Sequence, residues 1–277
     1  FVKKYNSLIN KFTKYIPLIS FFSLRSSLAR QYFFDKIRLN LETLYELVFH
    51  LDKSLLEISD SEFGNPIGLY KNNKFYTTEF LRNLIKINYI KKNTNFDKIK
   101  SIVELGAGIG SLASSFLKLK KDLKYIIIDI PPTLFISEYY LKNLDFKVFG
   151  YEDFKKSNNI DLNLIFKNYQ VVCIPSWKVD LLKSYQYDLF INIASFQEME
   201  KSQSLNYLKK IKKNINNYFY LENAIKGHIK AVKKNSFGVM DPTHMKDCEE
   251  ELSDTFAIKN KEINNETSTY KTIFEKK

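Results

Sequence analysis

Short apolar runs alternate with longer segments of helical spacing through the last two thirds of the chain. Each run has the length of a strand that is buried on both faces. The runs lie at residues 102–105, 124–130, 169–174, 187–194 and 218–223, and two further β-like runs follow at 255–262 and 269–275. Because strands that alternate with helices form mostly parallel sheets with helices on both faces, we expect an α/β fold.

The first 95 residues follow a helical pattern instead. Apolar side chains recur at helical spacing in 37–55, and a further helix is expected over 78–87. The stretch between them, 59–74, is rich in turn-forming residues. We therefore divide the chain into a helical N-terminal cap or lid, residues 1–95, and an α/β domain, residues 96–277.

The stretch 99–113 has the pattern of a buried strand that ends in a carboxylate, a glycine-rich turn and the start of a helix. The carboxylate is Glu104, and the turn contains Gly106, Ala107, Gly108 and Gly110. Glycines let the backbone turn tightly and approach a ligand closely. A dinucleotide fingerprint would need one more glycine, at the position of Ser111. The turn therefore suits a nucleotide-like cofactor but departs from the dinucleotide pattern.

Two acidic residues narrow the choice of cofactor. Glu104 would repel a pyrophosphate, whereas it would attract the cationic amino-acid end of S-adenosylmethionine. Asp129 ends the next apolar run about 20 residues beyond the glycines, where a Rossmann-like fold places the acid that binds ribose hydroxyls. Asp129 could instead cap the following helix, although Pro131 and Pro132 already mark that helix start. We therefore expect S-adenosylmethionine as the cofactor, and not NAD.

Three motifs carry a resemblance to a known family. They are VELGAGIG at 103–110, IDIPPTLFISEYYL at 128–141 and NIASFQEM at 192–199. In these motifs the chain resembles the bacterial sugar O-methyltransferases, a branch of the class I S-adenosylmethionine-dependent enzymes. The resemblance spans roughly residues 64–223.

This resemblance implies a Rossmann-like fold in which helices flank a mostly parallel seven-stranded sheet and the N-terminal extension covers the cofactor. Residues at the matching cofactor-binding positions are Glu104, Gly106, Ala107, Gly108, Gly110, Asp129, Ile130, Ser176, Trp177 and Asn192. Trp177 follows the third strand of the domain, where these enzymes often hold adenine, so its ring would stack on the base or pack in the core. No metal is expected, because Asn192 stands where metal-dependent relatives have an acid.

The catalytic base should lie beyond the carboxyl ends of the parallel strands, where open α/β sheets bind ligands. Glu198 follows the fourth strand and is our first choice for the base that removes a hydroxyl proton. It could instead complement the dipole of the next helix. His244 is the second choice, because imidazole titrates near neutrality. We interpret His228 as a surface residue and His50 as structural.

These observations predict an enzyme that transfers a methyl group from S-adenosylmethionine to a hydroxyl of a sugar, whether free, nucleotide-linked or in a glycan. Two alternatives stay open: a methyltransferase for nucleic acid or another small molecule, and a non-catalytic cofactor-binding domain of a larger protein. Enzymes that methylate base amines usually have an Asn/Asp-Pro-Pro-aromatic motif after the fourth strand. The chain has NIASF there, which argues against the nucleic-acid alternative.

The charge of the chain bears on its partners. Its net charge is +12, but only four of its cations are arginine, the residue that phosphate and base readers favour. We therefore expect a sugar or glycan acceptor and no nucleic-acid partner. Residues 1–30 carry six cations, interleaved aromatic side chains and no acid. This segment could contact an anionic membrane surface or an acidic glycan carrier, or form a helix with a solvated lysine face.

The two cysteines, Cys173 and Cys248, are too few for a metal cluster, and we expect both to be reduced, as in a cytoplasmic protein. No apolar run approaches the roughly 18 residues that span a bilayer. Because the chain begins with phenylalanine, we expect further residues upstream of Phe1, where a targeting sequence could lie.

Overall fold

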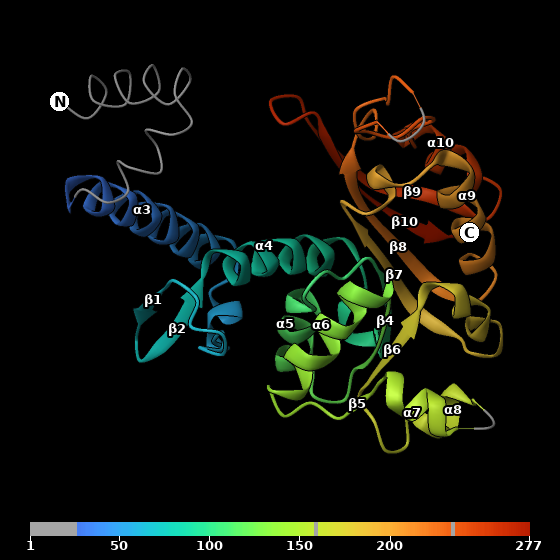
Figure 1. Cartoon of the computed structure of the whole chain (residues 1–277), viewed down its shortest axis with the longest axis horizontal. Coiled ribbons are helices and arrows are strands. Elements are labelled where there is room, and N and C mark those ends of the chain that lie inside the picture. Colours follow the sequence, from blue (N-terminus) through green and yellow to red (C-terminus); the bar gives the residue numbers. More distant parts are fainter. Residues whose placement is uncertain (1–26, 158–159, 234–235) are drawn as a thin grey trace.

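The computed structural model describes residues 27–157, 160–233 and 236–277 (Figure 1). The basic, aromatic segment that the sequence singles out lies outside the described residues as far as residue 26. Its contact with a membrane surface or glycan carrier stays a prediction.

A large, mostly parallel sheet forms the centre of the molecule, in the order β5-β6-β4-β3-β7-β8-β10-β9 (Figure 1). The six strands from β5 to β8 pair in parallel, and β10 pairs antiparallel with both β8 and β9. The strands are β3 (Ser101–Leu105), β4 (Lys124–Asp129), β5 (Val148–Phe149), β6 (Val171–Pro175), β7 (Tyr187–Ile193), β8 (Ile215–Ala224), β9 (Phe256–Asn264) and β10 (Thr269–Lys276). The predicted α/β fold is confirmed, and the two-residue β5 adds an edge strand to the seven expected.

Helices cover both faces of this sheet, as predicted (Figure 1). Side chains alternate across each strand, so that Ile102 packs in one core and its neighbour Val103 in the other. The first core contains side chains of α5 (Ser111–Leu119) and α6 (Pro131–Lys142). The second contains side chains of α7 (Tyr151–Lys156), α8 (Leu162–Ile165), η3 (Ser176–Ser184), η4 (Phe196–Glu198), α9 (Lys201–Ile211) and α10 (Met245–Leu252).

The N-terminal region contains a β-hairpin besides its helices. The hairpin consists of β1 (Gly68–Lys71) and β2 (Lys74–Thr77), and its two turn residues, Asn72 and Asn73, have φ of 52° and 60°. Positive φ at both positions is the geometry of a tight hairpin turn that asparagine tolerates. The sequence indicated only a turn-rich stretch there. The helices of the region are α3 (Ser27–Asp52), η1 (Lys53–Glu57) and α4 (Thr78–Asn93), and η2 (Phe96–Lys98) leads into β3.

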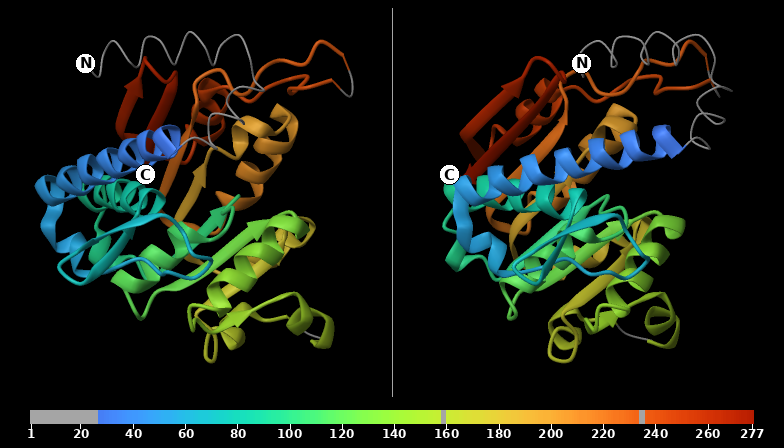
Figure 2. Two further views of the ribbon diagram at one scale, coloured as in Figure 1. Left: turned by 60° about the vertical axis from the view of Figure 1, so that its left-hand side comes forward. Right: turned by 90° about the vertical axis from the view of Figure 1, so that its left-hand side faces the viewer.

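Helix α4 joins the N-terminal region to the sheet. Its start is capped by Thr77, whose side chain accepts a hydrogen bond from the backbone N–H of Phe80. Its buried residues, such as Ile87, belong to the same core as Ile102 of β3. Helix α3 packs on α4 and β1 (Figure 2). The core is therefore continuous across residue 95, and α4 covers one face of the sheet.

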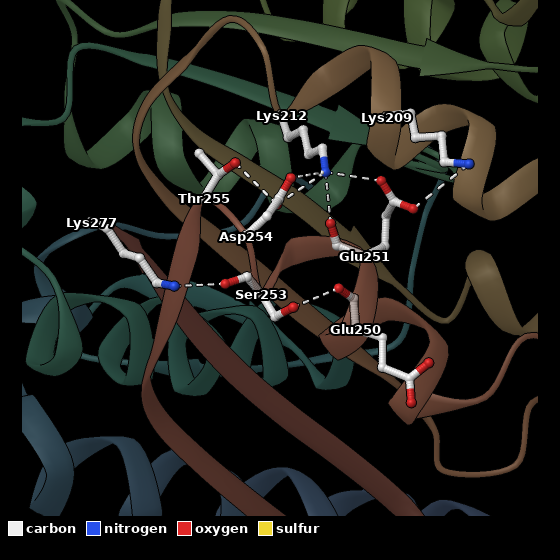
Figure 3. A network of polar contacts seen from close by, with 8 residues as sticks. All are labelled: Lys209, Lys212, Glu250, Glu251, Ser253, Asp254, Thr255 and Lys277. Carbon is white, nitrogen blue, oxygen red and sulfur yellow. Dashed lines mark hydrogen bonds and ion pairs between the residues drawn. The ribbon is translucent and has the colours of Figure 1, made fainter.

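A network of charged groups joins α9, α10 and the start of β9 (Figure 3). Lys212, directly after α9, donates through Nζ to the backbone oxygen of Glu251 at 2.8 Å. The same ammonium lies 3.0 Å from the Glu251 carboxylate and 2.9 Å from that of Asp254. Lys277 donates to the backbone oxygen of Ser253 at 2.7 Å. These contacts fix the C-terminal elements to one another.

Candidate functional site

The glycine turn and Asp129 are bound to each other where β3 and β4 end. The N–H of Gly106 donates to the backbone oxygen of Ile128 at 2.9 Å, and the N–H of Gly108 donates to Asp129 Oδ2 at 3.3 Å. Asp129 Oδ1 accepts from the N–H of Ile130 at 2.8 Å. The structure thus places these predicted cofactor residues at one edge of the sheet, around a turn whose conformation the chain itself fixes.

Two of the glycines in this turn are required by their geometry. Gly106 has φ of 81°, and a Cβ added there would collide with the side chain of Ser195, in the loop after β7. Gly110 has φ of 83° and forms the N-cap of α5. Ser137 of α6 holds the turn from outside by donating to the backbone oxygen of Gly108 at 2.7 Å. Larger residues at 106 or 110 would therefore move the turn.

Glu104 is a buried carboxyl group, only 3% exposed, at the end of β3. Its Oε2 accepts a hydrogen bond of 2.7 Å from the hydroxyl of Tyr125 on β4. Burial raises the pKa of Glu104 to about 7, while the hydrogen bond from Tyr125 and the charge of Lys86 act in the opposite direction. No ion pair to Glu104 occurs among the described residues. A cation brought here by a ligand would therefore be strongly attracted.

Asp129 shares this character. Burial raises its pKa, and the backbone N–H groups of Ile130, Gly108 and Ala107 act in the opposite direction. A carboxylate held by backbone N–H groups keeps further lone pairs that can accept from ligand hydroxyls. Its geometry is compatible with the predicted ribose contact. The alternative role, a side-chain cap on α6, does not occur, because α6 has no side-chain hydrogen bond at its cap.

Asn192 links three strands at the same edge. Its Nδ2 donates to the backbone oxygen of Leu105 at 3.0 Å, and its Oδ1 accepts from the N–H of Phe196 and from Asn223 Nδ2, both at 3.1 Å. The side chain is fully buried. It holds the ends of β3, β7 and β8 together, and its predicted contact with the cofactor stays a prediction.

The loop after β7 contains a strained residue. Ala194 has φ of 54°, in the left-handed region that costs a residue with a side chain on the order of 1–3 kcal/mol. Its N–H donates to the backbone oxygen of Glu222 at 2.8 Å. Such strain is kept at functional sites because the surrounding contacts impose it. Here it turns the chain so that Ser195 lies against Gly106.

Glu198 and His228 face each other beyond the ends of β7 and β8. The distance between Glu198 Oε2 and His228 Nε2 is 3.6 Å. Glu198 is 54% exposed at its side chain, and His228 is half-buried against the ring of Phe237. The N–H of His228 also donates to the backbone oxygen of Gln197 at 3.0 Å. The two side chains form an acid–base pair that is open to an incoming substrate.

His244 lies at the N-terminus of α10, in a segment bound to the start of α9. The N–H of Lys201 donates to the backbone oxygen of Asp241 at 2.8 Å, and the N–H of His244 donates to Asp247 Oδ2 at 2.8 Å. The His244 side chain is exposed. Within the described part of the chain no contact joins it to Glu198, so the two predicted base candidates are separate groups.

Ser176 and Trp177 follow β6 directly and begin η3. Pro175 pairs with Asp129 in the sheet, so both residues lie next to the predicted ribose position. Trp177 is 61% exposed. Core packing, one of the two roles considered for this ring, is therefore wrong, and stacking on adenine stays a prediction.

Neither a metal cluster nor a membrane span is found in the described ranges. There the structure brings together no group of three or more His, Cys, Asp or Glu side chains that could hold a metal ion. None of the helices described is both long enough and apolar enough to cross a bilayer. The buried thiols Cys173 and Cys248 are not joined in a disulfide.

Two groups at the site had no clear signal in the sequence. The pattern indicated a surface role for His228, whereas the structure places it beside Glu198, 30 positions earlier in the chain. Lys86, on α4, has the sequence context of any solvated helix lysine. Only the packing of α4 on the sheet brings its charge near Glu104.

No family model and no curated protein matches this chain. Similar solved structures include the pyocyanin biosynthetic protein PhzM, with 12% identity and a TM-score of 0.43 over 72% of this chain and 58% of that protein. Magnesium protoporphyrin IX methyltransferase from Synechocystis PCC 6803 with bound SAH has 10% identity and a TM-score of 0.47, over 72% and 84%. A SAM-dependent methyltransferase from Aquifex aeolicus has 14% identity and a TM-score of 0.42, over 69% and 89%. The chain thus spans less than two thirds of the first of these proteins, and at these values the similarities do not identify its ligand or substrate.

Proposed function

We propose that the protein is an S-adenosylmethionine-dependent O-methyltransferase that acts on a hydroxyl of a sugar. The observation that carries the proposal is the pair of buried carboxyl groups, Glu104 and Asp129, at either side of the glycine turn. Glu104 lacks an ion-pair partner in the described chain, and Asp129 is held by backbone N–H groups. One suits an ammonium group and the other suits ribose hydroxyls.

The residues around the turn fit such a cofactor in their chemistry. The turn brings backbone close to the ligand at Gly106 and Gly108, and Ile130 and Trp177 offer exposed apolar surface at the ends of β4 and β6. An exposed indole next to an apolar side chain suits the face of adenine. Pyrophosphate would instead meet the negative charge of Glu104 whenever that group is ionised.

When bound, S-adenosylmethionine supplies a methyl group on a sulfonium, which a hydroxyl oxygen displaces in line. The chain must then orient the hydroxyl and accept its proton. Glu198 and His228, 3.6 Å apart, are suited to this task because either can take the proton while the other stabilises the resulting charge. The strands β7 and β8 hold them in place through Asn192, Asn223 and the loop 194–198.

A sugar acceptor is supported by the resemblance of the motifs at 128–141 and 192–199 and by the polar groups beyond β7 and β8. Sugars present several hydroxyls, and a site lined by Glu198, His228 and the Gln197 amide can bind them by hydrogen bonds. We also propose a cytoplasmic location, since both cysteines are reduced thiols.

The test is methyl transfer from labelled S-adenosylmethionine to a panel of free sugars, nucleotide sugars and glycans, with RNA, DNA and aromatic hydroxyl compounds as competing classes. We expect label in at least one sugar class and none in nucleic acid. Label in nucleic acid or in aromatic compounds alone would contradict the sugar assignment. Cofactor binding without transfer to any class would favour a non-catalytic module.

A further inference from the structure

Two polar side chains of helix α4 reach the start of α5, next to the glycine turn. Asn83 is buried and donates through Nδ2 to Ser111 Oγ at 3.1 Å. Lys86, one turn further along α4, donates through Nζ to Asn83 Oδ1 at 3.3 Å. Ser111 directly follows Gly110. The ammonium group of Lys86 is therefore only two hydrogen bonds away from the glycine turn.

The charge of Lys86 is held in place but weakly matched. Its side chain is 18% exposed, and its ion pair within the described chain is with Glu79, whose carboxylate is 51% exposed and 3.5 Å away. An ion pair to an exposed carboxylate at this distance contributes little to stability. A largely buried ammonium group is costly to desolvate unless a stronger partner arrives. Lys86 thus has capacity for an anionic ligand group.

Lys86 also lies on the same side of the sheet as Glu104. Side chains of α4 and α5 share one core with Ile102 of β3 and Tyr125 of β4. Tyr125 is the donor to Glu104, and the positive charge of Lys86 acts on the Glu104 carboxyl. The two groups do not form an ion pair with each other. The space at the glycine turn is therefore bounded by a cation and a carboxyl group that are kept apart.

An α-amino acid group carries an ammonium and a carboxylate on one carbon atom, and it would match both of these charges at once. We propose that Lys86 binds the α-carboxylate of the methionyl part of S-adenosylmethionine, while Glu104 binds its ammonium group. Ser111 and the first turn of α5, whose N–H groups have no partners within the helix, complete the carboxylate site. This inference rests on the proposed function, and it assigns to the N-terminal region a direct part in binding the cofactor.

The experiment compares two ligands by calorimetry with the full chain and with Lys86→Met. S-adenosylhomocysteine carries the amino acid group, whereas 5′-methylthioadenosine has the same nucleoside and thioether without it. Losing one charged hydrogen bond weakens binding by about 10- to 100-fold. We expect this loss for S-adenosylhomocysteine and unchanged affinity for 5′-methylthioadenosine. Lys86→Arg, which keeps the charge, should restore part of the affinity.

Lys92→Met is the matched control, because Lys92 lies on the same helix and is exposed. It should bind both ligands as the unchanged chain does. An equal loss of both ligands in Lys86→Met, or no loss of either, would overturn the assignment of Lys86. Failure of the unchanged chain to bind either ligand would instead overturn the proposed function itself, so the two failures are distinguishable.

Discussion

The two ends of β8 contain polar clusters that differ in how their charges are matched. Near its amino end, the ammonium of Lys212 contacts the carboxylates of Glu251 and Asp254 directly (Figure 3). Near its carboxyl end, Glu104 accepts from a tyrosine hydroxyl and Asp129 from backbone N–H groups. Both carboxyl groups there have raised pKa values because they are buried without a cation.

This difference separates residues that hold the fold together from residues that wait for a ligand. A matched charge lowers the free energy of the folded chain, whereas a buried carboxylate without a cation raises it. The unmatched groups also surround the glycine turn and the strained Ala194. Variants at the two ends should therefore separate stability from ligand binding and turnover.

The largest expected effect is on turnover. Glu198→Gln removes the carboxylate from the pair with His228 and should lower kcat by about 10²- to 10⁴-fold. Affinity for S-adenosylhomocysteine should not change, because Glu198 lies outside the predicted cofactor contacts. His228→Gln should cause a loss of similar size if the two act as a pair. Normal turnover in both variants, with loss in His244→Gln, would move the base to His244.

The next effect is on cofactor affinity. Asp129→Ala removes a charged acceptor worth about 1.5–3 kcal/mol, which corresponds to roughly 10- to 100-fold weaker binding of S-adenosylhomocysteine in a titration. Asp122→Ala is the control, because Asp122 is exposed and pairs with Lys100. Equal affinity of the Asp129 and Asp122 variants would show that Asp129 does not bind the ribose.

A smaller effect concerns pH. Because the pKa of Glu104 is raised to about 7, its carboxyl is mostly protonated at pH 6 and ionised at pH 8. Affinity for S-adenosylhomocysteine should therefore rise about tenfold from pH 6 to pH 8, in proportion to the ionised fraction. Glu104→Gln should bind weakly and show no such rise. A flat profile in the unchanged chain would mean that Glu104 does not meet the ammonium group.

The same pKa shift has a consequence for stability. The folded chain holds the Glu104 proton more tightly than the unfolded chain, whose glutamate has the ordinary pKa of 4.5. The contribution of this group to the free energy of unfolding should therefore fall as pH rises from about 4.5 to about 7. Denaturant titrations of the unliganded chain and of Glu104→Gln should differ in this interval, and parallel curves would contradict the assignment.

The smallest expected effect is at the other end of β8. Lys212→Met should lower the free energy of unfolding by about 1–2 kcal/mol, because it removes charged contacts that are only partly buried. Thermal unfolding should show a lower Tm, by about 2–4 °C per kcal/mol. Lys209→Met, 3.9 Å from Glu251 and exposed, should change little. A loss of cofactor affinity in Lys212→Met would contradict the separation of the two clusters.

Much of the fold could be predicted from the apolar runs. Each of the seven runs contains a strand, and the run at 187–194 matches β7 (Tyr187–Ile193) almost residue for residue. Buried parallel strands are detectable because they are uniformly apolar. The hairpin β1–β2 was missed because its four-residue strands are partly polar and lie inside a turn-rich stretch.

The candidate site divides in the same way. Glu104, the glycines and Asp129 belong to local motifs, so their spacing alone predicted that they would meet. The proximity of Glu198 to His228 depends on how the loops after β7 and β8 fold together. That of Lys86 to the glycine turn depends on the packing of α4 against the sheet. Such contacts between distant segments leave no pattern in a single sequence.

The most direct test of cofactor binding is a calorimetric titration of the full chain with S-adenosylmethionine and S-adenosylhomocysteine, with NAD as the control. We expect micromolar binding of the first two, with one site per chain, and no binding of NAD. Binding of NAD, or of none of the three, would contradict the proposal that the glycine turn, Glu104 and Asp129 form a site for S-adenosylmethionine.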